Sequence, residues 1–227
     1  MNILALDTSA KHYSLALGKD AEVKFYRNVR STKKVSDSLI PSIDQLLKKA
    51  GMKLKDIDGF AVGTGPGAFT GLRVGLSTVK ALAYSTQKPI VTISSLDILA
   101  NTVRTNDSAI CAVVDAKRNM IYGCQYQKRK GLLEKIGNYE LTDIKTFLKS
   151  VKTKSVFIGD GANLYSDDIR SSSKCSSIYQ DRVGFPQVKY IFPLVYEKFR
   201  QKAYEDPAAL IPIYLYPEDC QVKRKVS

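Results

Sequence analysis

The N-terminal third of the chain alternates short apolar runs with polar segments of turn length. Apolar runs at residues 3–7, 13–18 and 21–27 lie so close together in the sequence that tight turns must join them. Such spacing is typical of successive antiparallel strands. We therefore expect a three-stranded meander at the start of the chain.

A helix is predicted to follow this meander, because apolar residues then recur every three or four positions. Ser36 or Ser38 can cap its start, and Gly51 suits the left-handed position that ends a helix. Pro41 then lies near the first turn or kinks the helix. The apolar face of this helix consists of Leu39, Ile43, Leu46, Leu47 and Ala50.

Residues 59–103 alternate strand and helix patterns. Buried strands are expected at 59–63 and 89–94, with helices over 70–85 and from 95 to about 103. A meander followed by alternating helices and strands is typical of an α/β lobe.

The pattern begins again after a polar break at residues 104–108. An apolar run that ends in Asp115, a turn, and an apolar run at 120–126 repeat the order found around Asp7. A later strand at 155–158 is again followed by a Gly-x-Gly sequence. This internal repeat predicts two related lobes.

Two lobes that each begin with strand, acid, turn and strand resemble the actin, Hsp70 and sugar kinase (ASKHA) superfamily, whose lobes are ribonuclease H-like. The predicted fold is accordingly α/β and two-lobed. Its N-terminal lobe is expected at residues 1–104 and a reduced C-terminal lobe at 105–227. Within the second lobe, residues 163–185 show little pattern and are expected to be rich in loops.

Composition places the chain among ordinary globular proteins. It has 227 residues, of which 44% are hydrophobic and 25% charged, which argues against disorder as the main state. No apolar run approaches the roughly 20 residues needed to cross a bilayer, so no membrane contact is expected. The cysteines are scattered, which argues against a zinc ribbon and indicates a reducing, cytoplasmic setting. They are Cys111, Cys124, Cys175 and Cys220.

The net charge of +13 favours a polyanionic partner, because cations that meet phosphates release condensed counterions. Basic residues gather at 24–34, 128–130 and 223–225. A solvated basic surface explains the same charge equally well. The sequence leaves both interpretations open.

A glycine-rich segment at 63–71 lies between a predicted strand and a predicted helix, where backbone N–H groups can bind an anion. It is not a Walker A loop, because Gly-Lys-Ser/Thr is missing. A dinucleotide-binding loop is disfavoured as well, because no acid stands about 20 residues onward. The favoured interpretation is structural: the glycines supply positive φ, Pro66 fixes the turn and Thr70 caps the helix.

The helix that follows has one face without bulk. Gly71 and Gly75 recur one helical turn apart, and Ser77 and Thr78 follow them. Such a face lets another backbone approach closely. The approaching element is either the helix at 36–50 or an equivalent helix of another subunit, and the sequence does not choose between them.

Three motifs in this order resemble the TsaB family, also called YeaZ. They are Asp7-Thr8-Ser9 after the first strand, Leu39-x-Pro41 in the first helix, and Gly65-Pro66-Gly67-Ala68-Phe69-Thr70-Gly71-Leu72-Arg73 before the second. The likeness continues at 80–83 and 94–96 and returns at 212–215. Val35 stands where members commonly have histidine, Ala68 where they have serine and Tyr216 where they have arginine.

This resemblance implies a partner subunit without catalytic residues, metal or cofactor of its own. Family members work with the transferase TsaD and the ATPase TsaE in threonylcarbamoyl transfer to the adenosine beside the anticodon of tRNAs that read codons beginning with A. They form homodimers when TsaD is absent, and ATP is used by the complex. tRNA is a further candidate partner, reached through the complex, and the sequence leaves direct contact with it open.

The resemblance also implies which residues matter. The family motif comprises Asp7, Thr8, Ser9, Gly65, Pro66, Gly67, Phe69 and Thr70. The implied partner and dimer interface lies on the helices at 36–50 and 70–85 and comprises Leu39, Ile43, Leu46, Gly71, Arg73, Gly75, Thr78 and Leu82.

Enzymatic alternatives meet obstacles in the residues themselves. His12 is the single histidine and has no partner at metal-ligand spacing, so we expect an exposed turn residue and no metal site or protease chemistry. An ATP-dependent small-molecule kinase of the ASKHA superfamily is the main alternative. The loops at 7–12 and 115–119 contain no glycine, however, so its nucleotide site would be degenerate. A ribonuclease H-like nuclease ranks third, since Asp7 and Asp115 would lie in different lobes.

Overall fold

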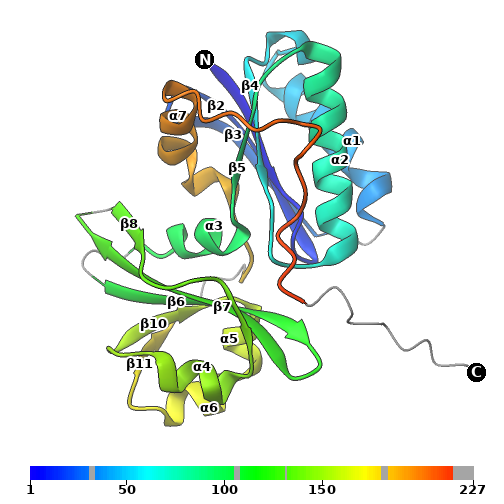
Figure 1. Cartoon of the computed structure of the whole chain (residues 1–227). Coiled ribbons are helices and arrows are strands. Elements are labelled where there is room, and N and C mark those ends of the chain that lie inside the picture. Colours follow the sequence, from blue (N-terminus) through cyan, green and yellow to red (C-terminus); the bar gives the residue numbers. More distant parts are fainter. Residues whose placement is uncertain (31–33, 105–107, 131, 180–183, 217–227) are drawn as a thin grey trace, which may run out of the picture.

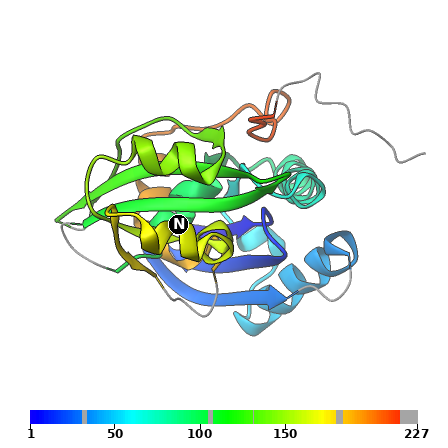
Figure 2. The same ribbon diagram turned by 90° about the horizontal axis from the view of Figure 1, so that it is seen from below.

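The computed structural model describes residues 1–30, 34–104, 108–130, 132–179 and 184–216. Two β-sheets lie one above the other in Figure 1, and the helix α3 (Ser95–Asn101) lies between them. Figure 2 shows the molecule from below, with the second sheet and its helices nearest the viewer. The predicted two-lobed α/β fold is confirmed.

The first sheet has the strand order β3-β2-β1-β4-β5. Its strands are β1 (Asn2–Asp7), β2 (His12–Lys19), β3 (Glu22–Arg30), β4 (Gly59–Gly63) and β5 (Ile90–Ile93). β1, β2 and β3 pair antiparallel, whereas β4 and β5 extend the sheet in parallel from β1. The predicted meander and the two later strands are confirmed.

Helices cover both faces of the first sheet. On one face lie α1 (Val35–Lys49), α2 (Phe69–Thr86) and the short 3-10 helix η1 (Leu54–Asp56). On the other face lie α7 (Phe192–Arg200) and the 3-10 helix η2 (Val188–Tyr190).

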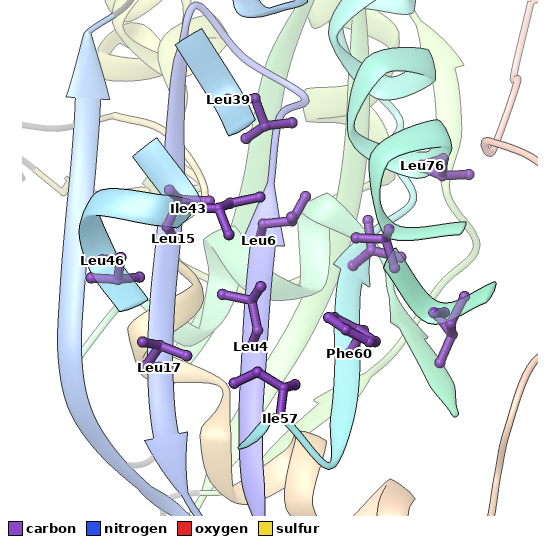
Figure 3. Close-up of a cluster of buried hydrophobic side chains, with 14 of the residues drawn as sticks. Leu4, Leu6, Leu15, Leu17, Leu39, Ile43, Leu46, Ile57, Phe60 and Leu76 are labelled. Atoms are coloured by element: carbon purple, nitrogen blue, oxygen red, sulfur yellow. The ribbon is translucent and has the colours of Figure 1, made fainter. Parts of the chain in front are cut away.

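Alternation along β1 divides the core between these two faces. Leu4 and Leu6 point towards α1 and α2, whereas Ile3 and Ala5 pack against α7. Figure 3 shows the first of these clusters. Full burial of a leucine or isoleucine contributes about 1.5–3 kcal/mol relative to exposure, so the apolar stripe of α1 holds this helix to the sheet. The buried apolar side chains of the stripe are Leu39, Ile43, Leu46 and Leu47.

The start of α1 differs from the expectation. The helix begins at Val35 with Lys34 as N-cap, and no side chain caps it. Ser36 therefore lies inside the first turn, two residues after the capping position, and Ser38 lies further in. Pro41 lies within α1 without ending it.

The second sheet has the strand order β11-β10-β6-β7-β8, and β9 pairs with β7. Its strands are β6 (Ser108–Lys117), β7 (Met120–Arg129), β8 (Leu132–Lys135), β9 (Glu140–Thr142), β10 (Ser155–Ile158) and β11 (Cys175–Ile178). Its helices are α4 (Ile144–Ser150), α5 (Asp160–Leu164) and α6 (Ser166–Ser171).

The internal repeat predicted from the sequence is present in the topology. β6 pairs antiparallel with β7 and parallel with β10, just as β1 pairs antiparallel with β2 and parallel with β4. The loop-rich prediction for 163–185 was wrong in part, because α6 and β11 lie within that range. Residues 180–183 lie outside the described part of the chain.

The two lobes do not divide at a single point in the sequence. Most of residues 184–216, predicted to belong to the second lobe, pack on the first, where Phe192 and Phe199 of α7 are buried against β1. Leu215 and Tyr216 at the end of this range pack with the second sheet. α3, assigned to the first lobe, packs Leu96 and Leu99 against Ile110 of the second sheet. The boundary predicted at 104/105 therefore has to be amended. A sequence repeat shows where a lobe begins but not where a later segment packs.

Within the described residues, no helix combines the length and the apolar character that crossing a bilayer requires.

Candidate functional site

β1 ends in a buried carboxylate. Asp7 accepts hydrogen bonds from the Ser9 backbone N–H at 2.9 Å and the Ser9 hydroxyl at 2.6 Å. Its second oxygen accepts one from the Ser95 hydroxyl at 2.5 Å. Burial raises the pKa of Asp7, while the bonds from Ser9 and Ser95 oppose the rise. The carboxylate thus ties the end of β1 to the start of α3.

Ser9 and Ser95, together with Ser94, also hold the glycine loop at residues 63–71. Gly65, at φ +95°, donates its N–H to the Ser95 hydroxyl, and its carbonyl accepts from the Ser94 hydroxyl and the Ser95 N–H. Ala68 donates its N–H to the Ser9 carbonyl at 2.6 Å. A Cβ on Gly67 would lie 2.4 Å from that same carbonyl oxygen. These backbone groups serve the fold, as the structural interpretation of the loop predicted, but of the loop's glycines Gly65 alone has positive φ.

The capping prediction at the start of α2 was wrong. The helix begins at Phe69 with Ala68 as N-cap, so Thr70 lies in the first turn and no side chain caps the helix. Alanine has no oxygen that could accept from the first backbone N–H groups.

The small face of α2 packs against the 7–9 loop of its own lobe. The Thr8 hydroxyl donates to the Gly71 carbonyl at 2.8 Å. A Cβ on Gly71 would lie 2.2 Å from the Thr8 carbonyl oxygen, and one on Gly75 would lie 2.1 Å from the Thr8 Oγ1. Close approach was predicted correctly. The backbone that approaches belongs to the 7–9 loop, whereas the sequence had suggested the helix at 36–50 or a helix of another subunit.

Most of the implied interface residues are unavailable to a partner. Leu39, Ile43 and Leu46 are buried in the core of the first lobe, and Gly71 and Gly75 are buried against the 7–9 loop. An apolar stripe spaced for a helix cannot by itself tell a core from an interface.

The remaining interface residues are accessible, and other exposed side chains stand beside them. Arg73 is exposed, and Thr78 and Leu82 are half-buried. Three large apolar side chains on the same helices face solvent: Ile40, Phe69 and Tyr84, which are 50%, 51% and 79% exposed.

A cleft of about 890 Å³ opens between the lobes beside this loop. Phe69, Arg73 and Tyr214 form its rim: the guanidinium lies 3.7 Å from the centre of the Phe69 ring, and Arg73 Nε donates to the Tyr214 hydroxyl at 3.1 Å. The C-terminal segment that carries Tyr214 runs beside α2, held by the Ile213 N–H on the Thr64 carbonyl.

The opposite wall of the cleft comes from the second lobe. Asp115 forms an ion pair with Lys117 and donates its N–H to Asp160 at 3.0 Å. The bond to Asp115 raises the pKa of Lys117, and burial raises that of Asp160. Lys117, Arg118 and Asn119 all have positive φ, which turns this basic loop sharply at the edge of the cleft.

The cleft therefore has charged and aromatic walls, but the carboxylate of Asp7 is not among them. Its two oxygens are used by Ser9 and Ser95. The described residues contain no group of three His, Cys, Asp or Glu side chains close enough to hold a metal ion. The interface and motif residues meet around this cleft only in part, through Ser9, Gly67, Phe69 and Arg73.

His12 is not the exposed turn residue that was expected. It is the first residue of β2, half-buried, and its ring stacks on Phe185 with centroids 4.9 Å apart. Burial lowers its pKa, and the charges of Arg30 and Lys11 lower it further. The ring is thus a neutral packing element at pH 7.

Comparison with known proteins places this chain in a family. The family model described as TsaD, tRNA N6-adenosine threonylcarbamoyltransferase, matches residues 29–215. The tRNA threonylcarbamoyladenosine biosynthesis protein TsaB of Bacillus subtilis is 34% identical over 172 residues, which cover 74% of this chain and 75% of that protein. The chain belongs to the TsaB family. A Haemophilus influenzae protein of the same name is 28% identical over 96% of this chain and 94% of its own length.

Solved structures agree with the TsaB assignment. YeaZ from Pseudomonas aeruginosa superposes with a TM-score of 0.81 at 25% identity, covering 94% of this chain and 99% of that one. The activator of 2-hydroxyisocaproyl-CoA dehydratase from Clostridium difficile, with bound ADPNP, gives a TM-score of 0.51 at 13% identity over 91% of this chain and 99% of that one. This second likeness shows the fold alone, which is the two-lobed ASKHA fold.

The TsaB motif lies where the sequence indicated, but its partners were missed. In the sequence, Ser95 and Tyr214 stand out only as parts of stretches that resemble the family, and their contacts with Asp7 and Arg73 were not predicted. A topological signal for Ser95 existed, because β1, β4 and β5 are parallel and their carboxyl ends meet at one edge of the sheet. No pattern in the sequence brings Tyr214 to Arg73.

The three positions that depart from the TsaB pattern have different surroundings. Val35 packs partly buried at the start of α1, and Ala68 is exposed at the N-cap of α2. Tyr216 lines the cleft, where its hydroxyl donates to the Ala116 carbonyl at 2.9 Å.

Proposed function

We propose that this chain is a non-catalytic partner subunit in tRNA threonylcarbamoyladenosine biosynthesis. It acts with a TsaD-type transferase and a TsaE-type ATPase, which transfer the threonylcarbamoyl group to the adenosine beside the anticodon of tRNAs that read codons beginning with A. The names of the curated relatives support the pathway. A tRNA substrate is consistent with the cytoplasm as the place of action.

The observation that carries the proposal is the burial of the Asp7 side chain and the hydrogen bonds that it accepts. In the kinase alternative, Asp7 would have to reach a substrate in the cleft in order to act as a base. Here that carboxylate is buried and bonded to Ser9 and Ser95, so it connects β1, the glycine loop and α3. This supports a scaffold over the alternative of an ATP-dependent kinase. We propose accordingly that the chain has no cofactor of its own and that its nucleotide site is degenerate.

The proposed partner face consists of the solvent-facing side chains of α1 and α2. Ile40, Phe69, Arg73 and Tyr84 are exposed there, and an exposed tyrosine or arginine is the kind of residue that anchors protein interfaces. Exposed apolar area of this kind favours contact with another protein. We propose that the same face contacts the transferase and, when the transferase is absent, a second copy of this chain.

Co-purification with the cognate transferase tests this face. Ile40→Asp and Tyr84→Asp each place a charge on the proposed interface and are expected to abolish recovery of the transferase. Leu132→Asp, at a 72% exposed position on β8, is the matched control and should retain it. Gly75 is unsuitable for this purpose, since a Cβ there would collide with Thr8. Full recovery with both α1 and α2 variants would contradict the proposed face.

Activity of the chain alone tests the absence of catalysis. The purified chain, given Mg²⁺ and ATP, is expected to release no ADP above the buffer rate and to cleave no peptide. Robust turnover that disappears in an Asp7→Asn or Asp160→Asn variant would support the kinase alternative and overturn the proposal.

A further inference from the structure

Four side chains from three separate parts of the sequence form an alternating stack where the lobes join. Tyr26 lies on β3, Lys189 and Tyr190 on η2, and Arg104 just after α3. The Lys189 ammonium lies 4.1 Å from the centre of the Tyr26 ring and 4.8 Å from that of Tyr190. The Arg104 guanidinium lies 4.9 Å from the centre of the Tyr190 ring. We call Tyr26, Lys189, Tyr190 and Arg104 the junction ladder.

The junction ladder lies at an accessible place in the fold. β3 is the edge strand of the first sheet, and Tyr26 is 53% exposed on it. Arg104 is exposed, and Lys189 and Tyr190 are half-buried. η2 packs on β1, β2 and α3, so the ladder reaches from the first sheet to the end of α3, which lies between the two sheets (Figure 1).

Among the described residues, positive charge collects here. Lys128 of β7 lies beside Arg104, and its ammonium donates to the Val103 carbonyl at 2.6 Å. None of the ion pairs found among the described residues includes Arg104, Lys128 or Lys189. Burial and the charge of Arg104 lower the pKa of Lys128. Cations held this close favour an anion between them.

We propose that the junction ladder is an RNA-binding surface, with Lys189 and Arg104 on phosphates and the Tyr26 ring available for stacking on a base. Aromatic rings interleaved with cations are the means by which proteins bind nucleic acid without reading sequence. An acidic protein would use the cations but has no need of the rings. That the RNA is tRNA rests on the proposed function, through the names of the relatives.

A simpler role for the junction ladder is a clasp that fixes η2 to β3 and to the end of α3, since each cation–π contact stabilises the fold by about 0.5–1 kcal/mol at an exposed site. If the junction ladder is only a clasp, removing its charges should lower the stability of the fold and leave the affinity for RNA unchanged. An RNA-binding surface predicts a loss of affinity and a smaller dependence on salt. The two roles are therefore separable by one set of variants.

The test measures binding of the full-length chain to unmodified tRNA by fluorescence anisotropy over a range of salt concentrations. Arg104→Gln with Lys189→Gln removes two positive charges from the ladder. Lys149→Gln with Arg170→Gln is the matched control, because it removes two charges from exposed positions on α4 and α6, which cover the face of the second sheet opposite α3.

The ladder variant is expected to bind tRNA about tenfold more weakly than the control variant. Its plot of log K against log salt concentration should be shallower by about 1.4–1.8, which corresponds to two lost phosphate contacts. Tyr26→Leu should weaken binding about fivefold or more with the salt slope unchanged, because stacking is lost and no charge changes. Melting temperatures of all variants identify any that unfold, and Tyr26→Leu keeps the proposal testable if the double variant does.

Several results would overturn the proposal. They are equal affinity and equal slope for the ladder and control variants, no binding by the wild-type chain at low salt, and loss of a protein partner with tRNA binding intact. Failure of the proposed function is distinguishable, because the ladder variant would still lose tRNA binding in a chain that has no effect on threonylcarbamoyladenosine.

Discussion

At the scale of single residues, the glycine loop is held together by side-chain hydrogen bonds, and one position in it provides none. Asp7, Ser94 and Ser95 each bond the loop or its neighbours, whereas Ala68 occupies the N-cap of α2 with no side-chain oxygen. Serine is among the best N-cap residues. Ala68 therefore leaves the start of α2 less stable than its backbone geometry allows.

Ala68→Ser is expected to raise the free energy of unfolding by about 0.5–1 kcal/mol, because the hydroxyl can accept from a backbone N–H in the first turn. Ala68 has the extended backbone of an N-cap, at φ −62° and ψ 113°, and is exposed, so the extra atom meets no crowding. Chemical denaturation of the two proteins measures the difference. A neutral or destabilising result would show that the loop geometry does not allow capping.

The buried carboxylate of Asp7 gives a prediction about pH. Its folded-state pKa is raised above the ordinary 3.8, so the folded protein binds a proton more tightly than the unfolded chain does. Stability due to this group is greatest at low pH and declines as pH rises from about 3.8 through the raised folded-state pKa. The unfolding free energy of wild type minus that of Asp7→Asn should therefore increase on acidification. A difference that stays flat from pH 7 to pH 4 would contradict the raised pKa.

At the scale of elements, α2 and the 7–9 loop depend on one another. The glycine spacing in α2 was sufficient to predict that a backbone comes close, but the identity of that backbone depends on β1 and β4 being neighbours. Periodicity likewise gave the buried stripe of α1, though not whether it faced a core or a partner. Local patterns thus define faces, and the arrangement of strands decides what each face meets.

A double-mutant cycle tests this dependence. Gly75→Ala is expected to destabilise the protein by about 1–3 kcal/mol, because the new Cβ would lie 2.1 Å from Thr8 Oγ1 and force a shift. Thr8→Ala removes that oxygen, so the double variant should lose less stability than the sum of the two single variants. Strict additivity in denaturant unfolding would mean that Gly75 and Thr8 are not coupled.

At the scale of the whole molecule, the chain leaves the first lobe and returns to it. The pairing of β6 with β7 and with β10 follows from the internal repeat and was predictable from sequence, whereas β11 was not. The return of α7 and its flanking residues to the first lobe was not predictable, because the apolar residues of α7 resemble those of any amphipathic helix and do not indicate which sheet they cover. The same return brings η2 against β3 and Tyr214 against Arg73.

Phe192→Ala is expected to destabilise the protein by about 3–5 kcal/mol, because the ring is fully buried between α7 and the first sheet. Leu194→Ala on the same helix is the control and should cost less than about 1 kcal/mol, since Leu194 is 41% exposed. Equilibrium unfolding in urea compares the two. Similar small losses would show that α7 contributes little to the first lobe.

The account as a whole is tested most directly by reconstituting tRNA modification from purified components. Unmodified tRNA, ATP, the threonylcarbamoyl donor system, the cognate transferase and the TsaE-type ATPase are combined with or without this chain, and threonylcarbamoyladenosine is measured by mass spectrometry of digested nucleosides. We predict modification only when the chain is present, with no product from the chain alone. Modification at the same rate without it would contradict its role as a required partner.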